Sequence, residues 1–199
     1  MKRKTTDSID LNADNGCERD TELIFRIKEG DRSGFEELVD KYQKRILSCA
    51  YKITGDWHAA QDISQDVFIS LIEKVDTYDP ERSFFSWIYR IAVNRSIDYL
   101  RRQGRERRLL GNESLHPVRE ADAEELMVKA EMRKKVRNVL KKLPLKYRIA
   151  LVLRDIENIP ASRIAEILDL VPATARWRIF QARKLFRDIW NKEGADYGL

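Results

Sequence analysis

One segment of the sequence combines aromatic and basic side chains in a way that suits unpaired nucleic acid. Residues 83–102, SFFSWIYRIAVNRSIDYLRR, carry an aromatic cluster at the front and arginines behind it. Aromatic faces can stack on bases, and arginines can neutralise phosphates. Phe84 and Trp87 also have the spacing of a buried stripe, whereas Phe85 and Tyr89 lie on other faces. We therefore expect one helix that is half core and half nucleic-acid surface.

A second basic segment lies near the C-terminal end of the chain. The pattern predicts a short helix over residues 160–168 and a longer helix over 174–192, joined by a tight turn. Small Ala165 lies where the two helices must approach each other. The longer helix carries Arg176, Arg178, Arg183, Lys184 and Arg187. Two short helices of which the second is basic are typical of a helix-turn-helix, whose second helix enters the major groove of DNA.

The composition favours a helical protein with a polyanionic partner. Of the 199 residues 36% are charged, and the net charge is +5. Only eight glycines and five prolines are present, and no segment alternates as a strand does, so we expect an all-α fold. No apolar run approaches the ~20 residues that span a bilayer, and the basic N-terminus lacks the apolar stretch of a secretory signal. We therefore expect no membrane insertion.

The cysteines and histidines argue against a metal or cofactor site. Cys17 and Cys49 lack metal-ligand spacing, and His58 and His116 are the only histidines. We expect no cofactor, no metal and no catalytic residues. Unpaired cysteines fit a reducing, cytoplasmic location.

Three further helices are expected before the aromatic segment, over residues 21–29, 35–53 and 57–75. Residues 1–20 are expected to be loose, without regular structure. Thr54-Gly55-Asp56 separates the second from the third, and residues 77–82 form a loop. The third helix has an apolar stripe consisting of Ala60, Ile63, Val67, Leu71 and Ile72. These long helices can bury one shared core.

An acidic linker divides the chain. Five carboxylates minus Arg119 leave a net charge of −4 in residues 111–125, which also contain Gly111 and Pro117. We predict a first domain over residues 21–103, a linker over 104–125 and a second domain over 126–192. Helices over 126–143 and 147–155 open the second domain.

Two stretches of the chain resemble a known family. The first includes DISQDVF at 62–68 and DPERSFFSWIYRIAVNRSIDYLRR at 79–102, and the second is LKKLPLKYRIALVLRDIENIPASRIAEILDLVPATARWRIFQARKLF at 140–186. Both resemble the extracytoplasmic-function (ECF) group of bacterial sigma factors, the promoter-specificity subunits of RNA polymerase. The resemblance implies a region 2-like domain of three or four helices, an acidic linker and a region 4-like helix-turn-helix domain.

The resemblance also implies a docking site for polymerase on the helix over 57–75. Its matching residues are Asp62, Gln65, Asp66, Val67 and Phe68. Carboxylates and an amide around two apolar anchors would suit a basic coiled coil on the beta-prime clamp. The alternative is a solvated acidic helix face.

The aromatic segment matches the part of the family that opens DNA and captures a flipped base of the minus-ten element. The implied residues are Phe84, Trp87, Arg90, Asn94 and Arg95. Base flipping costs a few kcal/mol of stacking, and an aromatic side chain can return ~1–3 kcal/mol per base. For Asn94 an ordinary surface position is an equal alternative.

The last helix matches the element that reads the minus-thirty-five duplex. The implied residues are Thr174, Arg176, Trp177, Arg178, Phe180, Gln181 and Arg183. Core burial is an alternative for Phe180, and helix packing is one for Arg178 and Arg183. Trp177 replaces a residue that is usually small and polar, and Pro172 falls one place later than usual. These departures leave the promoter sequence open.

The function predicted from the sequence is promoter-specific transcription initiation, by a non-catalytic factor that binds core RNA polymerase (beta-prime clamp and beta flap) and promoter DNA. The resemblance also implies control by an anti-sigma factor. Two alternatives remain open. One is a stand-alone helix-turn-helix regulator that uses only residues 160–192. The other is an enzyme with a carboxylate metal site at Asp62, Asp66 and Glu73.

Overall fold

The computed structural model describes residues 11–80, 82–110 and 127–195, and all regular structure in them is helical. The elements are α1 (Leu11–Lys28), α2 (Arg32–Thr54), α3 (Trp57–Lys74), the 3₁₀ turn η1 (Val75–Thr77), α4 (Phe84–Leu110), α5 (Met127–Lys142), α6 (Leu145–Leu151), the π-helical turn η2 (Val152–Ile156), α7 (Ala161–Leu168) and α8 (Pro172–Ala195). The predicted all-α class is confirmed. None of these helices combines the length and apolar character needed to cross a membrane.

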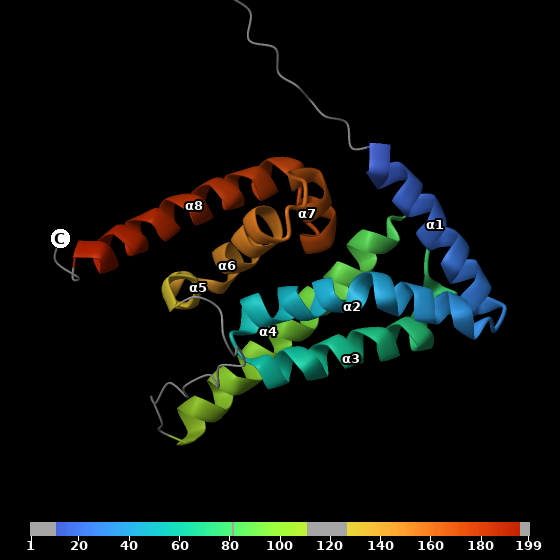
Figure 1. The fold of residues 1–199 in the computed structure, drawn as a ribbon, viewed down its shortest axis with the longest axis horizontal. Helices are drawn as coiled ribbons and strands as arrows, with labels where there is room; N and C mark the ends of the chain where they lie inside the picture. The colour runs from blue at the N-terminus through green and yellow to red at the C-terminus, as the bar shows by residue number, and fades with distance from the viewer. Residues whose placement is uncertain (1–10, 81, 111–126, 196–199) are drawn as a thin grey trace, which may run out of the picture.

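Helices α1 to α4 form the first group of the fold (Figure 1). Helix α2 packs against α1, α3 and α4, so it lies at the centre of this group. Its core stripe of Leu38, Ile46 and Ile53 is fully buried. Apolar burial of this kind is the main favourable term in folding, at about 25 cal/mol per Å². The predicted shared core of the long helices is confirmed.

The break between α2 and α3 lies where the sequence predicts it. Gly55 takes the left-handed conformation (φ 72°) that suits glycine, and its N–H donates to the carbonyl of Tyr51 at 2.7 Å. Asp56 caps α3 by accepting a hydrogen bond from the Ala59 N–H at 3.1 Å. Local hydrogen bonds therefore close both the last turn of α2 and the first turn of α3.

Two helices are longer than the sequence predicts. Helix α1 includes residues 11–20, which the sequence analysis expected to be loose. The helix is held in place because Leu23 and Ile24 are buried and Asp20 bonds to α2. Helix α4 continues past Gly104 to Leu110. The Tyr99 hydroxyl donates to Asp56 at 2.8 Å and accepts from Gln103 at 3.1 Å, which fixes α4 against the start of α3. Residues 111–126, most of the predicted linker, lie outside the described residues.

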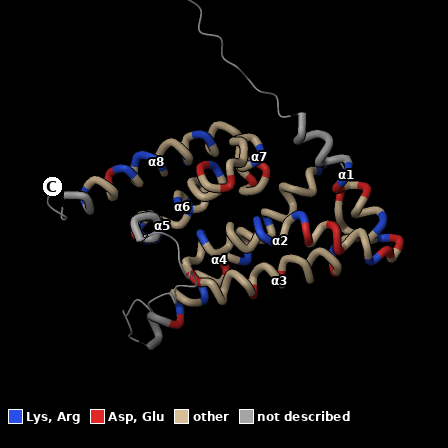
Figure 2. The backbone as a smooth tube through the Cα atoms, in the orientation of Figure 1, with Lys and Arg blue, Asp and Glu red and all other residues tan. Residues whose placement is uncertain are grey.

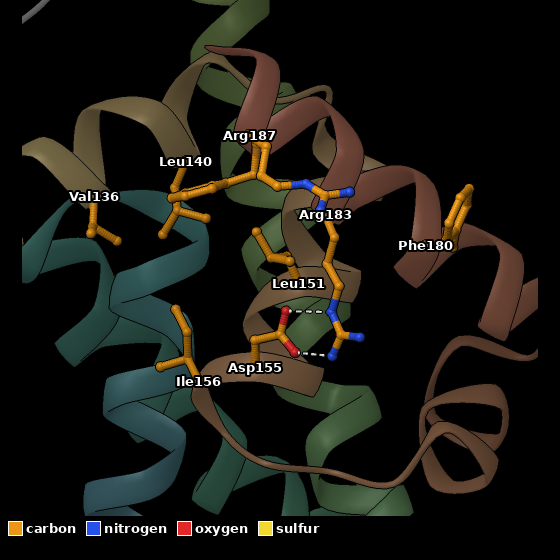
Figure 3. A pocket seen from close by; sticks show the side chains of 9 residues that line it. Val136, Leu140, Leu151, Asp155, Ile156, Phe180, Arg183 and Arg187 are labelled. Carbon is orange, nitrogen blue, oxygen red and sulfur yellow. Dashed lines mark hydrogen bonds and ion pairs between the residues drawn. The ribbon is translucent and has the colours of Figure 1, made fainter. Parts of the chain in front are cut away.

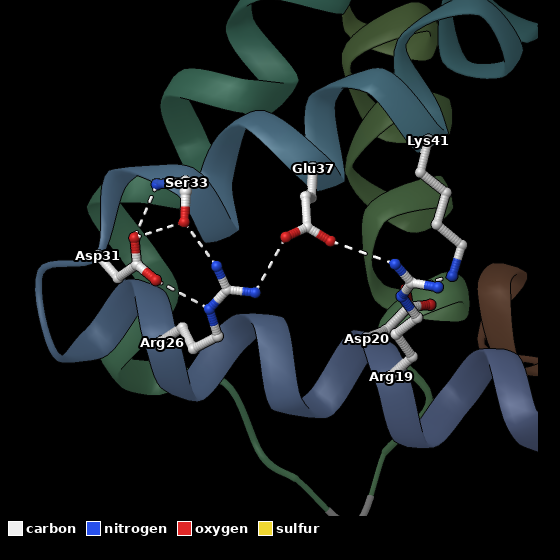
Figure 4. A network of polar contacts seen from close by, with 7 residues as sticks. All are labelled: Arg19, Asp20, Arg26, Asp31, Ser33, Glu37 and Lys41. Atoms are coloured by element: carbon white, nitrogen blue, oxygen red, sulfur yellow. Dashed lines mark hydrogen bonds and ion pairs between the residues drawn. The ribbon is translucent and has the colours of Figure 1, made fainter.

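A polar network joins α1 to α2 (Figure 4). The Arg26 guanidinium donates to Asp31 at 2.8 Å and to Glu37 at 3.0 Å. Asp31 caps α2 by accepting from the N–H and the hydroxyl of Ser33 at 2.8 and 2.7 Å. These Ser33 bonds and the Arg26 bond lower the pKa of Asp31 from 3.8 to about 2. Asp20 is buried and accepts from Lys41 and from the Tyr42 hydroxyl.

The second group, α5 to α8, contains the predicted helix-turn-helix. Helix α7 ends at Asp169, whose φ of 52° turns the chain, and the Leu170 N–H donates to the Ala165 carbonyl at 2.9 Å. Ala165 and Ala175 are buried between α7 and α8 and allow a close approach. Helix α8 begins at Pro172, two residues earlier than predicted, because proline is well suited to the first turn of a helix.

The two groups pack against each other. Helix α7 contacts α4, and η2 and α6 contact α2. One apolar cluster contains residues of both groups, among them Ile53, Phe84, Ile149 and Val152. The sequence predicted two domains joined by a linker but gave no sign of this contact.

The α1–α2 network generates a prediction about pH. Asp31→Asn keeps a capping oxygen but removes the carboxylate. The folded pKa of about 2 lies below the ordinary 3.8, so ionised Asp31 stabilises the fold above about pH 4, and this contribution is lost as the pH falls toward 2. In thermal unfolding, the variant should melt slightly below the wild type at neutral pH, and the difference should shrink below about pH 4. A difference that does not change with pH would contradict this role.

Candidate polymerase and nucleic-acid interfaces

Helix α3 presents its predicted polar residues to solvent. Asp62, Gln65 and Asp66 are all exposed. Val67 is fully buried and Phe68 is 7% exposed, so neither is an accessible apolar anchor as the sequence analysis expected. Both side chains contribute instead to the core of the first group.

Two isoleucines missed by the sequence analysis are the accessible apolar residues of α3. Ile69 and Ile72 are 53% and 55% exposed. The prediction that Ile72 belongs to the buried stripe is wrong, because a residue next to buried Leu71 is rotated about 100° around the helix. The spacing of Gln65, Ile69 and Ile72, at i, i+4 and i+7, is the signal that reveals this second face.

A groove of about 440 Å³ runs beside these residues, between α2 and α3. Phe35, Val39 and Leu47 line it from α2, and Phe68, Ile69 and Ile72 line it from α3. Gln43, Gln61 and Gln65 add polar groups. Figure 1 shows helix α3 on the other side of α2 from α7 and α8. The exposed face of α3 together with this groove is called the α3 face below.

The aromatic cluster at the start of α4 is core. Phe84 is fully buried, with its ring centroid 5.5 Å from that of Tyr42 and 6.0 Å from that of Tyr78. The expectation that Phe84 offers a stacking face is therefore wrong in this conformation. Trp87 is half-buried and lies 5.7 Å from Phe84.

The second aromatic set also turns inward rather than toward solvent. The rings of Phe85 and Tyr89 lie 4.6 Å apart, and the guanidinium of Arg45 on α2 covers both, at 5.4 and 5.9 Å. Tyr89 is fully buried. Packing against α2 thus explains the positions of Phe85 and Tyr89, which a single buried stripe on α4 did not explain.

The polar residues predicted on α4 have three different environments. Arg90 donates a hydrogen bond to the backbone carbonyl of Glu166 on α7. Asn94 is exposed and lines a cleft between α4 and the second group. Arg95 is exposed and donates to the Ser70 hydroxyl at 3.3 Å.

Helix α8 exposes part of its predicted DNA face, and Figure 2 shows that Lys and Arg recur along this helix. Arg176 is exposed, and Trp177 and Phe180 are 52% and 59% exposed. The core alternative for Phe180 is therefore wrong, and neighbouring Ile179 is the buried residue. Thr174, Arg178 and Gln181 are half-buried, and Arg178 lines the cleft beside Asn94.

Arg183 belongs to a different feature from the rest of the α8 face. Its guanidinium makes a two-bond ion pair with Asp155 of η2, one bond being 3.0 Å, and this raises the pKa of Arg183. The pair lies at an apolar pocket of about 550 Å³ between α5, α6 and α8, which Leu140, Leu151 and Phe186 also line (Figure 3). For Arg183 the contact with η2 favours the helix-packing alternative.

The metal-site alternative gains no support. In the described ranges, no group of three or more His, Cys, Asp or Glu side chains is arranged to hold a metal ion. Asp62, Asp66 and Glu73 therefore do not form such a group. Cys49 is buried, and burial raises the pKa of its thiol well above the ordinary range.

Comparison with known proteins assigns the family. The sigma-70 region 2 model matches residues 38–106, and the sigma-70 region 4 model matches residues 133–186. The ECF RNA polymerase sigma factor SigW of Bacillus subtilis is 33% identical over 173 residues, which cover 82% of this chain and 92% of that protein. The chain belongs to the ECF sigma factors. The ECF sigma-E factor of Escherichia coli is also 33% identical, over 83% of this chain and 91% of its own length.

Solved structures share the fold of this sigma factor. CnrH, in complex with the cytosolic domain of CnrY, matches with a TM-score of 0.68 and 23% identity over 87% of this chain and 98% of that chain. RpoE of Bartonella quintana, in complex with the anti-sigma factor NepR, matches with a TM-score of 0.62 and 18% identity over 79% of this chain and 96% of that chain.

The burial of Phe84 generates a prediction about stability. Phe84→Ala should lower the free energy of unfolding by ~3–5 kcal/mol, because it leaves a cavity between α2 and α4. Phe84→Leu fills most of this volume and should cost much less. Urea denaturation followed by circular dichroism measures both. Unchanged stability of Phe84→Ala together with lost DNA binding would instead support a stacking role.

Proposed function

We propose that this sigma factor recruits core RNA polymerase to promoters by reading the minus-thirty-five element with α8 and the melted minus-ten element with α4. The observation that carries the proposal is the presence of two separate exposed surfaces on one chain. The acidic and apolar α3 face suits a protein partner, and the N-terminal half of α8 suits the major groove. A stand-alone regulator would need only the second surface.

The α3 face is the proposed contact with the beta-prime clamp. Exposed Ile69 and Ile72 supply apolar area, and Asp62 and Asp66 flank it with negative charge. Interfaces typically combine an apolar centre with a polar rim, and charge complementarity speeds association with a basic partner. In this proposal Val67 acts indirectly, by holding α3 in place, and Phe68 contributes the part of its ring that lines the groove.

The polar side of α4 is the proposed minus-ten surface. With Phe84 in the core, the residues left for the DNA strand are Asn94, which can read a base edge, and Arg95, which can contact phosphate. Arg90 and Trp87 lie on the same helix and complete this surface. It is smaller and more polar than the sequence alone indicated.

The N-terminal half of α8 is the proposed minus-thirty-five reader. In a helix-turn-helix the first residues of the second helix reach the base edges. Arg176 and Trp177 are exposed there, and Thr174 and Gln181 are half-buried beside them. Arginine can bond to guanine in the major groove, and the flat Trp177 ring suits apolar contact with a thymine methyl group.

Two further partners belong to this proposal. The apolar pocket beside Asp155 and Arg183 is the proposed binding site for the beta flap. The ion pair between these two residues neutralises their charges at the edge of the pocket, so the partner would contact mainly apolar side chains. An anti-sigma factor is the proposed regulator, since RpoE, a structural neighbour, is captured with an anti-sigma factor. We place this activity in the cytoplasm and assign it no cofactor.

Transcription from a promoter library tests the proposal. Purified core polymerase should give specific run-off transcripts only when this chain is added. Arg176→Ala should relax the upstream preference, and Asn94→Ala the downstream preference, each by ~1–3 kcal/mol of discrimination. Tight binding to duplex DNA with no binding to core polymerase would overturn the proposal in favour of a stand-alone regulator.

The α3 face has its own test. Ile72→Asp should weaken binding to core polymerase by about tenfold or more, because central apolar residues of an interface often contribute ~2 kcal/mol. Phe25→Asp is a matched control, since Phe25 is 51% exposed but lies on α1. Both affinities can be measured by fluorescence anisotropy. Equal binding by the two variants would show that polymerase docks elsewhere.

A further inference from the structure

The cleft between α4 and the second group has the size of a small-molecule site. Its volume is about 550 Å³, within the ~300–1,000 Å³ that is usual for ligand pockets. One wall is a single face of α4, and the other wall comes from α6, α7 and α8. The charges and donors on these walls therefore indicate what kind of molecule the cleft can bind.

The charged residues of the cleft favour an anionic ligand. Arg90 and Arg101 line it from α4, Lys146 from α6 and Arg178 from α8. Asp169 is the only carboxylate among the described residues that line it, so four cations minus one carboxylate leave a net charge of +3. A concave wall of one charge sign concentrates ligands of the opposite sign.

These cations are not neutralised by strong ion pairs. Arg101 lies 3.8 Å from Asp98, and both side chains are largely exposed, so this pair is weak. In the described part of the chain, Arg178 forms no hydrogen bond or ion pair. Arg90 donates to the Glu166 carbonyl, but its Nε is buried and has no hydrogen-bond partner among the described residues. The cleft therefore offers positive charge and donors that the protein itself does not use.

The other residues of the cleft suit a nucleoside. Val93, Ile149 and Ile167 supply apolar surface beside the cations, against which a flat base can lie. Asn94 is exposed, and an amide can bond to the edge of a base. Asp169 is also exposed, and a carboxylate can accept hydrogen bonds from the hydroxyls of a ribose. This combination favours a nucleotide over inorganic phosphate.

The positions of the cations separate a nucleotide from other anions. Arg90 and Arg101 are about three turns apart, ~16 Å along α4, so one phosphate group cannot reach both. A DNA strand is the other polyanion that a basic cleft attracts. A strand continues beyond the cleft in both directions, whereas this volume matches a single small molecule.

The two walls of the cleft are held in place by polar contacts between the groups. The carboxylate of Glu157, just after η2, accepts hydrogen bonds from three donors of α2 and α4, which are Ser48 at 3.2 Å, Lys52 at 3.3 Å and Tyr89 at 3.4 Å. The Glu157 side chain is 6% exposed. Ligand pockets are usually largely pre-formed, and these contacts give the cleft that property.

We infer that this cleft binds a small nucleotide, with its phosphates at the cations and its base on the apolar wall. The site goes beyond the proposed function and does not depend on it, because the cleft is formed by the free chain.

Isothermal titration calorimetry of the full chain tests the site, in magnesium-free buffer at ~0.15 M salt so that attraction to distant charges is screened. The probes are ADP, GDP, inorganic pyrophosphate and adenosine. We expect at least one of the two nucleotides to bind with a micromolar Kd. Pyrophosphate and adenosine should each bind at least about tenfold more weakly, because each makes only part of the contacts.

Two results of this titration would overturn the inference. Absence of binding by both nucleotides at millimolar concentration would exclude the site. Pyrophosphate that binds as tightly as the nucleotides would show that the cleft is a site for small anions and does not recognise a nucleoside.

Matched substitutions locate the binding site. Arg101→Ala and Arg178→Ala each remove a cation of the cleft and should weaken nucleotide binding by about tenfold, because hydrogen bonds between charged groups are strong. Arg102→Ala and Lys184→Ala remove the same charge from exposed positions of α4 and α8 that do not line the cleft. These controls should keep the wild-type affinity within about twofold. Arg101 is exposed, so its removal should leave the fold intact, which circular dichroism checks.

Equal weakening by the cleft variants and their controls would overturn the site, because it would show attraction to the overall positive charge. DNA binding that is lost in Arg101→Ala and Arg178→Ala, without nucleotide binding by the wild type, would assign the cleft to DNA instead. Neither result contradicts the proposed function, which run-off transcription tests separately.

Discussion

The carboxylate of Glu157 is the point at which the two halves of this sigma factor depend on each other. It lies almost out of reach of water, and the three side chains that bond to it come from α2 and α4. These bonds add to the apolar cluster that both groups share, which includes Ile53, Ile149 and Val152. Together they hold the second group against α2 and α4, so that Asn94 lines a cleft with residues of the second group.

Helix α4 contributes both to the core and to the proposed DNA contact. Its buried aromatic residues determine which side of the helix is left for DNA. Phe84, Ile88 and Tyr89 are fully buried against the neighbouring helices. Only the side that carries Asn94 and Arg95 remains for nucleic acid, and Asn94 lines the cleft between α4 and the second group. The α3 face has no such conflict, which makes it suited to the first encounter with polymerase.

Much of the fold could be predicted from the sequence because it depends on interactions between residues that are close together in the chain. The break at Gly55, the helix-turn-helix and the stripe of α2 all follow from turn chemistry or helical period. The helical spacing of Phe84 also indicated its burial, and only the stacking role implied by the family resemblance failed. The exposure of Ile72 and the packing of Phe85 and Tyr89 under Arg45 could not be predicted in this way, because they depend on which face of a helix its neighbours cover. The contact at Glu157 joins residues more than a hundred positions apart and leaves no periodic trace.

The central claim is that one chain carries a surface for core polymerase on α3 and separate surfaces for promoter DNA on α4 and α8. The most direct measurement is a footprint on promoter DNA of the chain alone, of core polymerase alone and of the two together. We expect protection of both promoter elements only when the chain and core polymerase are both present. Equal protection of both elements by the chain alone would contradict the account.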